Sequence, residues 1–110
     1  MAAKHFTLSA DQIKPLAEGH GACLATDRIV VDGMCVGGMY REEPDFEGDS
    51  GWRCLAGDEL EDYLNNPENF GYYEVNTVAN YDPGIVALLG APTGSQFKLD
   101  RQTGKLVAVD

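Results

Sequence analysis

The spacing of apolar and polar positions predicts a chain built mainly from short strands. Apolar runs at residues 23–25, 29–31 and 35–40 fit three successive strands. Asp32-Gly33 follows the second run and is typical of a tight hairpin turn, because glycine adopts positive φ angles without strain. Gly37-Gly38 inside the third run indicates a bulge or a close approach of another backbone. We therefore expect a meander of strands in this part of the chain.

More strands are expected further along the chain. Residues 51–55 predict a strand antiparallel to residues 35–40, and residues 70–75 are aromatic and β-branched enough for another. Regular alternation over residues 96–100 and 105–109, with a glycine-containing turn between them, predicts a C-terminal hairpin. Together these runs predict an antiparallel sheet of about five to six short strands.

Two to three short helices are also expected. Ser9 and Gln12 have the spacing of a capping box, and Pro15 keeps any helix that starts there short. Asp58 is expected to cap a helix over residues 58–64, whose leucine and tyrosine side chains share one face. Asp82-Pro83 combines a capping side chain with a proline at the first helical position, so it predicts a third helix start.

Length and composition agree with one folded unit. The chain has 110 residues, of which 44% are hydrophobic, and this fits a single compact domain over residues 1–110 rather than a disordered segment. Short strands combined with a few short helices predict the α+β class.

The charge is acidic and unevenly distributed. The formal net charge is −10. Residues 41–69 hold ten acids and two bases and therefore account for −8, whereas the segments before and after them each carry −1. Such a surface repels phosphate, so we expect no nucleic-acid partner and no binding to anionic membranes. A cationic protein partner or a metal ion remains open.

The sequence favours a cytoplasmic location. No apolar run reaches the ~18 to 20 residues of a membrane span, and the first residues lack the apolar core of a signal peptide. The chain has three cysteines, Cys23, Cys35 and Cys54. Because this number is odd and no two of them have C-x-x-C spacing, they predict neither a disulfide framework nor a zinc site. We expect three reduced thiols packed among apolar neighbours, no bound metal and no cofactor.

The acidic segment contains one tryptophan and two arginines. Trp52 is best interpreted as a core anchor, with an interface residue as the second interpretation. Arg41 and Arg53 are the only bases in this segment, so each is expected to pair with nearby carboxylates and to fix the loop over residues 41–50.

A metal-binding or enzymatic site is the alternative function. Asp45, Glu47 and Asp49 alternate like the first ligands of a calcium loop, but the pattern lacks the glycine and the final glutamate that such a loop requires. The alternative would use these acids together with Asp58 and Glu59, with Arg41 or Arg53 as electrophile. It requires the groups to converge in one concave site.

Four blocks of sequence resemble a known family. They are M-Y-R-E-E-P-D at residues 39–45, D-S-G-W-R at 49–53, G-D-E at 57–59 and N-T-V-A-N-Y-D-P at 76–83. In this order they resemble a bacterial family first catalogued as a domain of unknown function and since grouped with immunity proteins of polymorphic toxin systems (immunity family thirty-three-like). The resemblance covers a core over residues 23–97, to which the hairpin over residues 96–109 is added.

The resemblance implies a non-catalytic binding protein that neutralises a cognate toxin, and it assigns no catalytic residue. We expect the partner to be a protein, for which a basic toxin domain encoded nearby is the candidate, because an acidic surface would steer such a partner and block its active site. The candidate binding residues are Tyr40, Arg41, Glu42, Glu43, Asp45, Asp49, Ser50, Trp52, Arg53, Asp58, Glu59, Asn76, Asn80, Tyr81 and Asp82.

Overall fold

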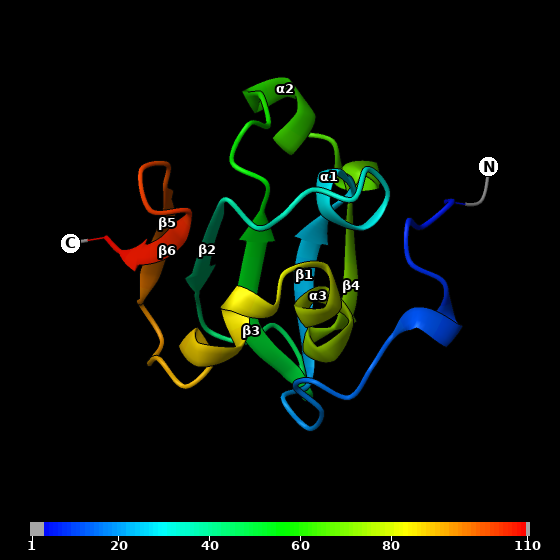
Figure 1. The fold of residues 1–110 in the computed structure, drawn as a ribbon, viewed down its shortest axis with the longest axis horizontal. Coiled ribbons are helices and arrows are strands. Elements are labelled where there is room, and N and C mark those ends of the chain that lie inside the picture. The colour runs from blue at the N-terminus through cyan, green and yellow to red at the C-terminus, as the bar shows by residue number, and fades with distance from the viewer. Residues whose placement is uncertain (1–3, 110) are drawn as a thin grey trace.

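A six-stranded sheet organises the chain, with the strand order β4-β1-β3-β2-β5-β6 (Figure 1). The computed structural model describes residues 4–109. The strands are β1 (Ala22–Thr26), β2 (Gly38–Arg41), β3 (Asp49–Leu55), β4 (Phe70–Glu74), β5 (Gln96–Asp100) and β6 (Lys105–Ala108). With several short helices on one face of this sheet, the fold belongs to the α+β class, as expected.

The sheet is mixed rather than purely antiparallel. β1 and β3 run parallel, while the four other neighbouring pairs are antiparallel. The prediction of a meander was wrong because residues 29–31 do not form a strand. The chain instead leaves β1 through the helical turn α1 (Asp27–Val30), which buries Ile29 and Val30 against the sheet. This crossover reverses the chain between β1 and β2, so that β3 comes to lie parallel to β1.

Gly33 ends helix α1 rather than turning a hairpin. Its φ is +79°, and its N–H donates to the carbonyl of Ile29 at 2.9 Å, while the Met34 N–H donates to the carbonyl of Arg28 at 3.0 Å. These two bonds and the positive φ close the turn that follows α1, where a glycine in the left-handed region commonly ends a helix. Because glycine serves both hairpin turns and helix ends, the Asp32-Gly33 pair could not distinguish them.

The other strand predictions are confirmed. β2 pairs antiparallel with β3, with Gly38 opposite Leu55 and Arg41 opposite Trp52. β4 forms as expected, and β5 and β6 form the predicted hairpin. The close backbone approach predicted at Gly37 is also present, since a Cβ on this residue would overlap the carbonyl oxygen of Ala56.

The remaining helices are short. They are η1 (Ala10–Gln12), α2 (Glu61–Leu64), η2 (Pro67–Asn69), α3 (Val75–Tyr81) and η3 (Pro83–Leu88). In the first, the Ser9 N–H donates to Gln12 Oε1 at 2.8 Å, as a capping box requires. Asp82 caps η3 by accepting the Gly84 N–H at 3.0 Å, as predicted. Asp58 does not cap α2, which begins three residues later and follows Leu60.

The hydrophobic core lies between the sheet and α1, α3 and η3, and in Figure 1 α3 stands in front of the β1 and β4 side of the sheet. Helix α3 was not predicted, since it follows β4 without an intervening turn signal. Trp52 is 1% exposed and occupies this core, which confirms the favoured interpretation. Cys23 and Cys54 are buried as expected, but Cys35 is exposed because it lies in the connection between α1 and β2.

Between residues 4 and 109, no helix combines the length and apolar character that crossing a bilayer requires.

Candidate binding face

Strand β3 presents opposite sides of the sheet with alternate residues. Trp52 and Cys54 point into the core, and Arg53 therefore lies on the face away from the helices. Its neighbours across the sheet are Leu24 on β1 and Tyr40 on β2. Leu24 is in turn opposite Tyr72 on β4. These side chains form a row across what we call the open face.

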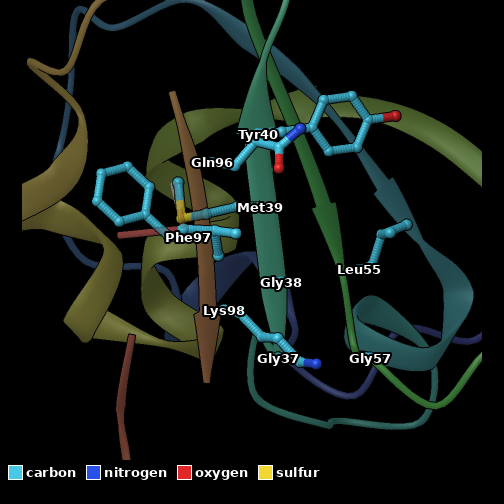
Figure 2. Close-up of a pocket in the computed structure, with 10 residues that line it drawn as sticks. Gly37, Gly38, Met39, Tyr40, Leu55, Gly57, Gln96, Phe97 and Lys98 are labelled. Atoms are coloured by element: carbon cyan, nitrogen blue, oxygen red, sulfur yellow. The ribbon is translucent and has the colours of Figure 1, made fainter. Parts of the chain in front are cut away.

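The row continues onto β5. Tyr40 lies opposite Gln96, and Gly38 lies opposite Lys98. Figure 2 shows Tyr40, Leu55, Gln96 and Lys98 directed to one side of the strands, whereas Met39 and Phe97 point to the other, into the core. Side chains of this open face line a shallow hollow over β2, β3 and β5, and a second hollow lies over β1 and β4 between Leu24, Tyr72 and Leu64.

Arg53 is the centre of an ion cluster at one end of the open face. Its side chain is only 2% exposed. Nη1 and Nη2 donate to Oδ1 and Oδ2 of Asp49 at 2.9 and 2.8 Å, so the pair is bidentate. Nε donates to Glu42 at 2.9 Å and Nη2 also to Asp45 at 3.3 Å. With a fifth bond from Nη1 to the Trp52 carbonyl at 3.1 Å, every N–H of the guanidinium has an acceptor.

The two buried members of this cluster stabilise each other's charged forms. Hydrogen bonds from Arg53, reinforced by the backbone N–H groups of Asp45 and Gly51, hold the pKa of Asp49 far below its usual range despite burial. Hydrogen bonds to Asp49 and Glu42 likewise raise the pKa of Arg53. One guanidinium facing three carboxylates leaves a local excess of negative charge, which is carried outward by the half-exposed side chains of Glu42 and Asp45.

The cluster also fixes the loop between β2 and β3. Asp49 accepts the N–H of Asp45 at 2.9 Å and that of Gly51 at 3.0 Å. Gly51 has φ +88°, and a Cβ there would overlap the carbonyl oxygen of Glu42, so only glycine fits. The loop is therefore exposed, as predicted, yet its backbone is held in one conformation. Glu43 and Glu47 project from it into solvent.

Two aromatic rings cover the cluster from the solvent side. The Tyr72 ring lies 5.7 Å from the guanidinium carbon of Arg53, and its hydroxyl donates to Asp45 at 3.0 Å. The Phe46 ring meets Tyr72 edge-on at 4.9 Å. Phe46 and Tyr72 remain 46% and 45% exposed. The sequence did not identify either residue as a candidate, although the aromatic alternation in residues 70–75 could have indicated Tyr72.

A second acidic segment lies beyond the opposite end of β3. Asp58, Glu61, Asp62 and Glu68 are exposed there, around α2 and η2. Asp58 faces Arg28 at 3.8 Å. β3 runs from Asp49 to Leu55, so the loop before Asp49 and the segment after Leu55 are separated by about 20 Å, at roughly 3.3 Å per residue. The open face is therefore flanked by acids at both ends.

Glu59 in this second segment has a structural role. Its carboxylate accepts the Thr26 hydroxyl at 2.6 Å and the N–H groups of Ala56 and Gly57 at 2.7 and 2.8 Å. Burial raises the pKa of Glu59, but these hydrogen bonds outweigh it and hold the pKa below its usual value. Glu59 thereby fastens the connection after β3 to the end of β1.

The five acids of the alternative metal or enzyme site do not converge. Asp45 and Asp49 contact Arg53 at one end of β3, whereas Asp58 and Glu59 lie past its other end. In the part of the chain that the structure describes, no three His, Cys, Asp or Glu side chains are arranged to hold a metal ion.

Arg41 does not pair with a carboxylate within residues 4–109, contrary to expectation. It is on the core side of β2 and stacks on the Trp52 ring at 5.5 Å. Its Nε donates to the Ser50 carbonyl at 2.9 Å and its Nη1 to the Ala91 carbonyl at 2.7 Å. Ser50 Oγ accepts the Trp52 N–H at 3.2 Å. Arg41 and Ser50 therefore join β3 to the segment after η3 and take no part in the open face.

The four candidates around α3 lie on the helical side of the sheet. Asn76, Asn80 and Tyr81 bind the main chain of the N-terminal segment through hydrogen bonds of 2.7 to 3.0 Å. Asp82 accepts the Val36 N–H at 3.0 Å in addition to capping η3. The structure therefore divides the candidates into an open-face group around Arg53 and a separate group around α3.

The fold and this surface define a small α+β domain that exposes one face of its sheet between two acidic segments. A family model, the immunity protein Imm33 domain, matches residues 23–110. The chain therefore belongs to the Imm33 family of immunity proteins. Membership implies a role in immunity to a toxin, exercised by binding a protein and without catalysis. No curated protein and no solved structure matches the chain significantly.

Proposed function

We propose that this chain neutralises a basic toxin domain by binding it on the open face, between the two acidic segments. The observation that carries the proposal is the row of Tyr72, Leu24, Arg53, Tyr40 and Gln96 on the face away from α1, α3 and η3, with acids beyond both ends of β3. The compartment we propose is the cytoplasm, where free thiols such as those of this chain stay reduced.

Charge supports a basic partner. Residues 41–49 hold five acids and one base, and residues 58–68 hold five acids and no base. An acidic surface with these two concentrations of charge attracts a cationic partner from a distance and orients it before contact. It also repels a second copy of this chain, whose net charge is −10.

The aromatic pair supports a defined point of contact. Phe46 and Tyr72 expose nearly half of their surface, and buried aromatic residues dominate the binding energy of protein interfaces. Tyr72 is held in place by Arg53 and Asp45, and the loop that carries Phe46 is fixed by Asp49. Such a surface loses little conformational entropy on binding.

The test is a binding measurement with a basic toxin domain encoded near this chain, the partner that we propose. We expect a complex whose association rate constant falls at least about tenfold between 50 and 300 mM NaCl, because steering is screened by salt. Glu43→Lys combined with Glu47→Lys should slow association further. Asp11→Lys makes the same kind of charge change on η1, outside both acidic segments, and serves as the control.

The outcome that would contradict the proposal is equally specific. An association rate constant that does not change with salt would place the interaction elsewhere. So would a loss of binding in the Asp11→Lys protein that is as large as the loss caused by Glu43→Lys or Glu47→Lys alone. Failure of the neighbouring toxin domain to bind at low salt would remove the proposed partner.

A further inference from the structure

The hollow over β1 and β4 lies between the two acidic segments of the open face. Leu24, Leu64, Phe70 and Tyr72 line it, and its volume is about 520 Å³. Tyr72 is bound through its hydroxyl to Asp45 of the acidic loop, while Leu64 belongs to α2 in the other acidic segment. The hollow therefore brings an apolar and aromatic wall next to both concentrations of negative charge.

Two exposed acids stand beside the residues that line the hollow. Glu61 precedes Leu64 by three residues in α2, so their side chains are neighbours on the surface of this helix. Glu68 directly follows Pro67, which also lines the hollow. Within residues 4–109, no lysine, arginine or histidine forms an ion pair with either acid. The two negative charges are therefore available to a cationic group of a partner.

Hydrogen bonds hold this rim of the hollow in one arrangement. Asn66 Oδ1 accepts the Glu68 N–H at 3.0 Å, and Asn69 Nδ2 donates to the Tyr63 carbonyl at 2.9 Å. These bonds tie η2 to α2. Asn65, whose exposed side chain carries an amide oxygen, lies between the two helices and also lines the hollow. Because the backbone of the rim is already ordered, little conformational entropy is lost when a partner binds there.

An apolar wall with acids at its rim fits a side chain that is apolar along its stem and cationic at its end. Arginine and lysine both place their methylene groups on apolar surface while the charged group stays in water. Arginine also stacks on aromatic rings and binds a carboxylate through two parallel hydrogen bonds. Arg53 makes both kinds of contact in this protein, since it lies 5.7 Å from the Tyr72 ring and pairs with Asp49. The chemistry of the hollow therefore favours arginine.

We propose that the hollow receives an arginine side chain of the toxin domain. The stem of this arginine lies against Leu24 and Leu64, and its guanidinium group reaches the carboxylates of Glu61 and Glu68. Arginine is among the residues that dominate the binding energy of protein interfaces, above all where it fills a pocket. The inference rests on the proposed function, because the toxin supplies the arginine, and it adds the kind of residue that this part of the open face recognises.

Titration of the full chain with Nα-acetyl-arginine amide, followed by NMR, tests the hollow without the toxin. We expect the amide signals of Leu24, Leu64 and Gly71 to shift and to saturate, with a dissociation constant of about 1 to 10 mM for a probe of this size. The amides of Gly38 and Lys98, which line the other hollow, should not shift. The citrulline derivative, which has the same shape without the charge, should bind at least about fivefold more weakly. The lysine derivative should also bind more weakly than the arginine derivative.

Two matched double variants test which acids bind the probe. Glu61→Gln with Glu68→Gln keeps the shape of the rim and removes its charge, so it should weaken binding of the arginine derivative at least about threefold. Glu43→Gln with Glu47→Gln makes the same change in the acidic loop, at residues that do not line the hollow, and should alter the binding by less than about twofold. All four acids are exposed, so both double variants should fold like the original chain.

Three results would overturn the inference: shifts that do not saturate, equal binding of the arginine derivative and either of the other two derivatives, or equal losses in the two double variants.

The toxin complex separates this inference from the proposed function. If Tyr72→Ala weakens the complex and Glu61→Gln with Glu68→Gln does not, the open face still binds the toxin and only the arginine assignment is overturned. If no basic toxin domain binds the chain, the proposed function fails, whereas the titration with the arginine derivative still decides whether the hollow selects arginine.

Discussion

Arg53 and Asp49 form a buried bidentate ion pair four residues apart on one strand, with N–O distances of 2.9 and 2.8 Å. Between the two residues the register of β3 against β1 shifts, and Gly51 has a φ of +88°. The pair connects stability with function, because the carboxylates and rings proposed to meet the toxin are arranged around it.

Removing the acid of this pair should destabilise the protein. Asp49→Ala leaves the guanidinium of Arg53 buried with only the half-exposed Glu42 and Asp45 to compensate it. We expect the free energy of unfolding, measured in urea, to fall by about 3 kcal/mol. The surface change Asp11→Ala should alter it by less than about 0.5 kcal/mol. Equal effects of the two changes would show that the pair contributes nothing specific.

Stability should depend on pH through the same carboxylate. The pKa of Asp49 is lower in the folded protein than in the unfolded chain, where it is about 3.9, so the unfolded state takes up the proton first. The contribution is therefore complete above about pH 5 and is lost as the pH falls through 4 towards the folded pKa. Urea unfolding at pH 7, 4 and 3 should show this loss, and Asp49→Asn should reduce it. Identical pH dependence in both proteins would contradict the assignment.

Two loop glycines provide a matched comparison. Gly48 and Gly51 have φ angles of +93° and +88°, but a Cβ on Gly48 meets nothing within 4 Å, whereas one on Gly51 overlaps the Glu42 carbonyl. Gly48→Ala should cost about 1 kcal/mol from backbone strain alone, and Gly51→Ala at least about 2 kcal/mol more. Thermal unfolding of the two variants measures the difference. Similar midpoints would mean that the loop relaxes around the added methyl group.

The acidic loop should not bind a divalent cation tightly. Both oxygens of Asp49 already accept hydrogen bonds from Arg53, and Asp58 and Glu59 lie at the other end of β3. Calcium and magnesium need six or more oxygen ligands around one point. Calorimetric titration with calcium, magnesium and manganese should give no saturable heat. A saturable signal that Asp45→Asn abolishes would restore the metal-binding alternative.

Local signals in the sequence predicted the elements whose partners are close in the chain. Alternation of apolar and polar residues predicted the β2–β3 pairing and the C-terminal hairpin. Capping chemistry predicted the role of Asp82, and residue size predicted the burial of Trp52. The parallel pairing of β1 with β3 could not be predicted in this way. It depends on whether the run at residues 29–31 coils or extends, and an apolar run of that length is compatible with both.

The candidate site was predicted in part for a similar reason. The segment over residues 41–69 was correctly identified as the place where charge gathers, and Arg53 was expected to pair with its acids. Which face each residue occupies was not accessible, so Arg41 was grouped with Arg53 although it lies on the core side. Phe46 and Tyr72 were missed because their contact joins a loop to a strand 26 residues further along the chain.

The most direct test of the account is the dissociation constant of the complex with the basic toxin domain proposed as partner, measured for Tyr72→Ala and Val86→Ala side by side. Both residues are exposed, at 45% and 38%, but Tyr72 lies on the open face and Val86 on η3. We predict that Tyr72→Ala weakens binding at least about thirtyfold, as expected for a residue worth about 2 kcal/mol at an interface, while Val86→Ala leaves it unchanged. Unchanged affinity in the Tyr72→Ala protein, with its fold intact, would contradict the claim that the open face binds the toxin.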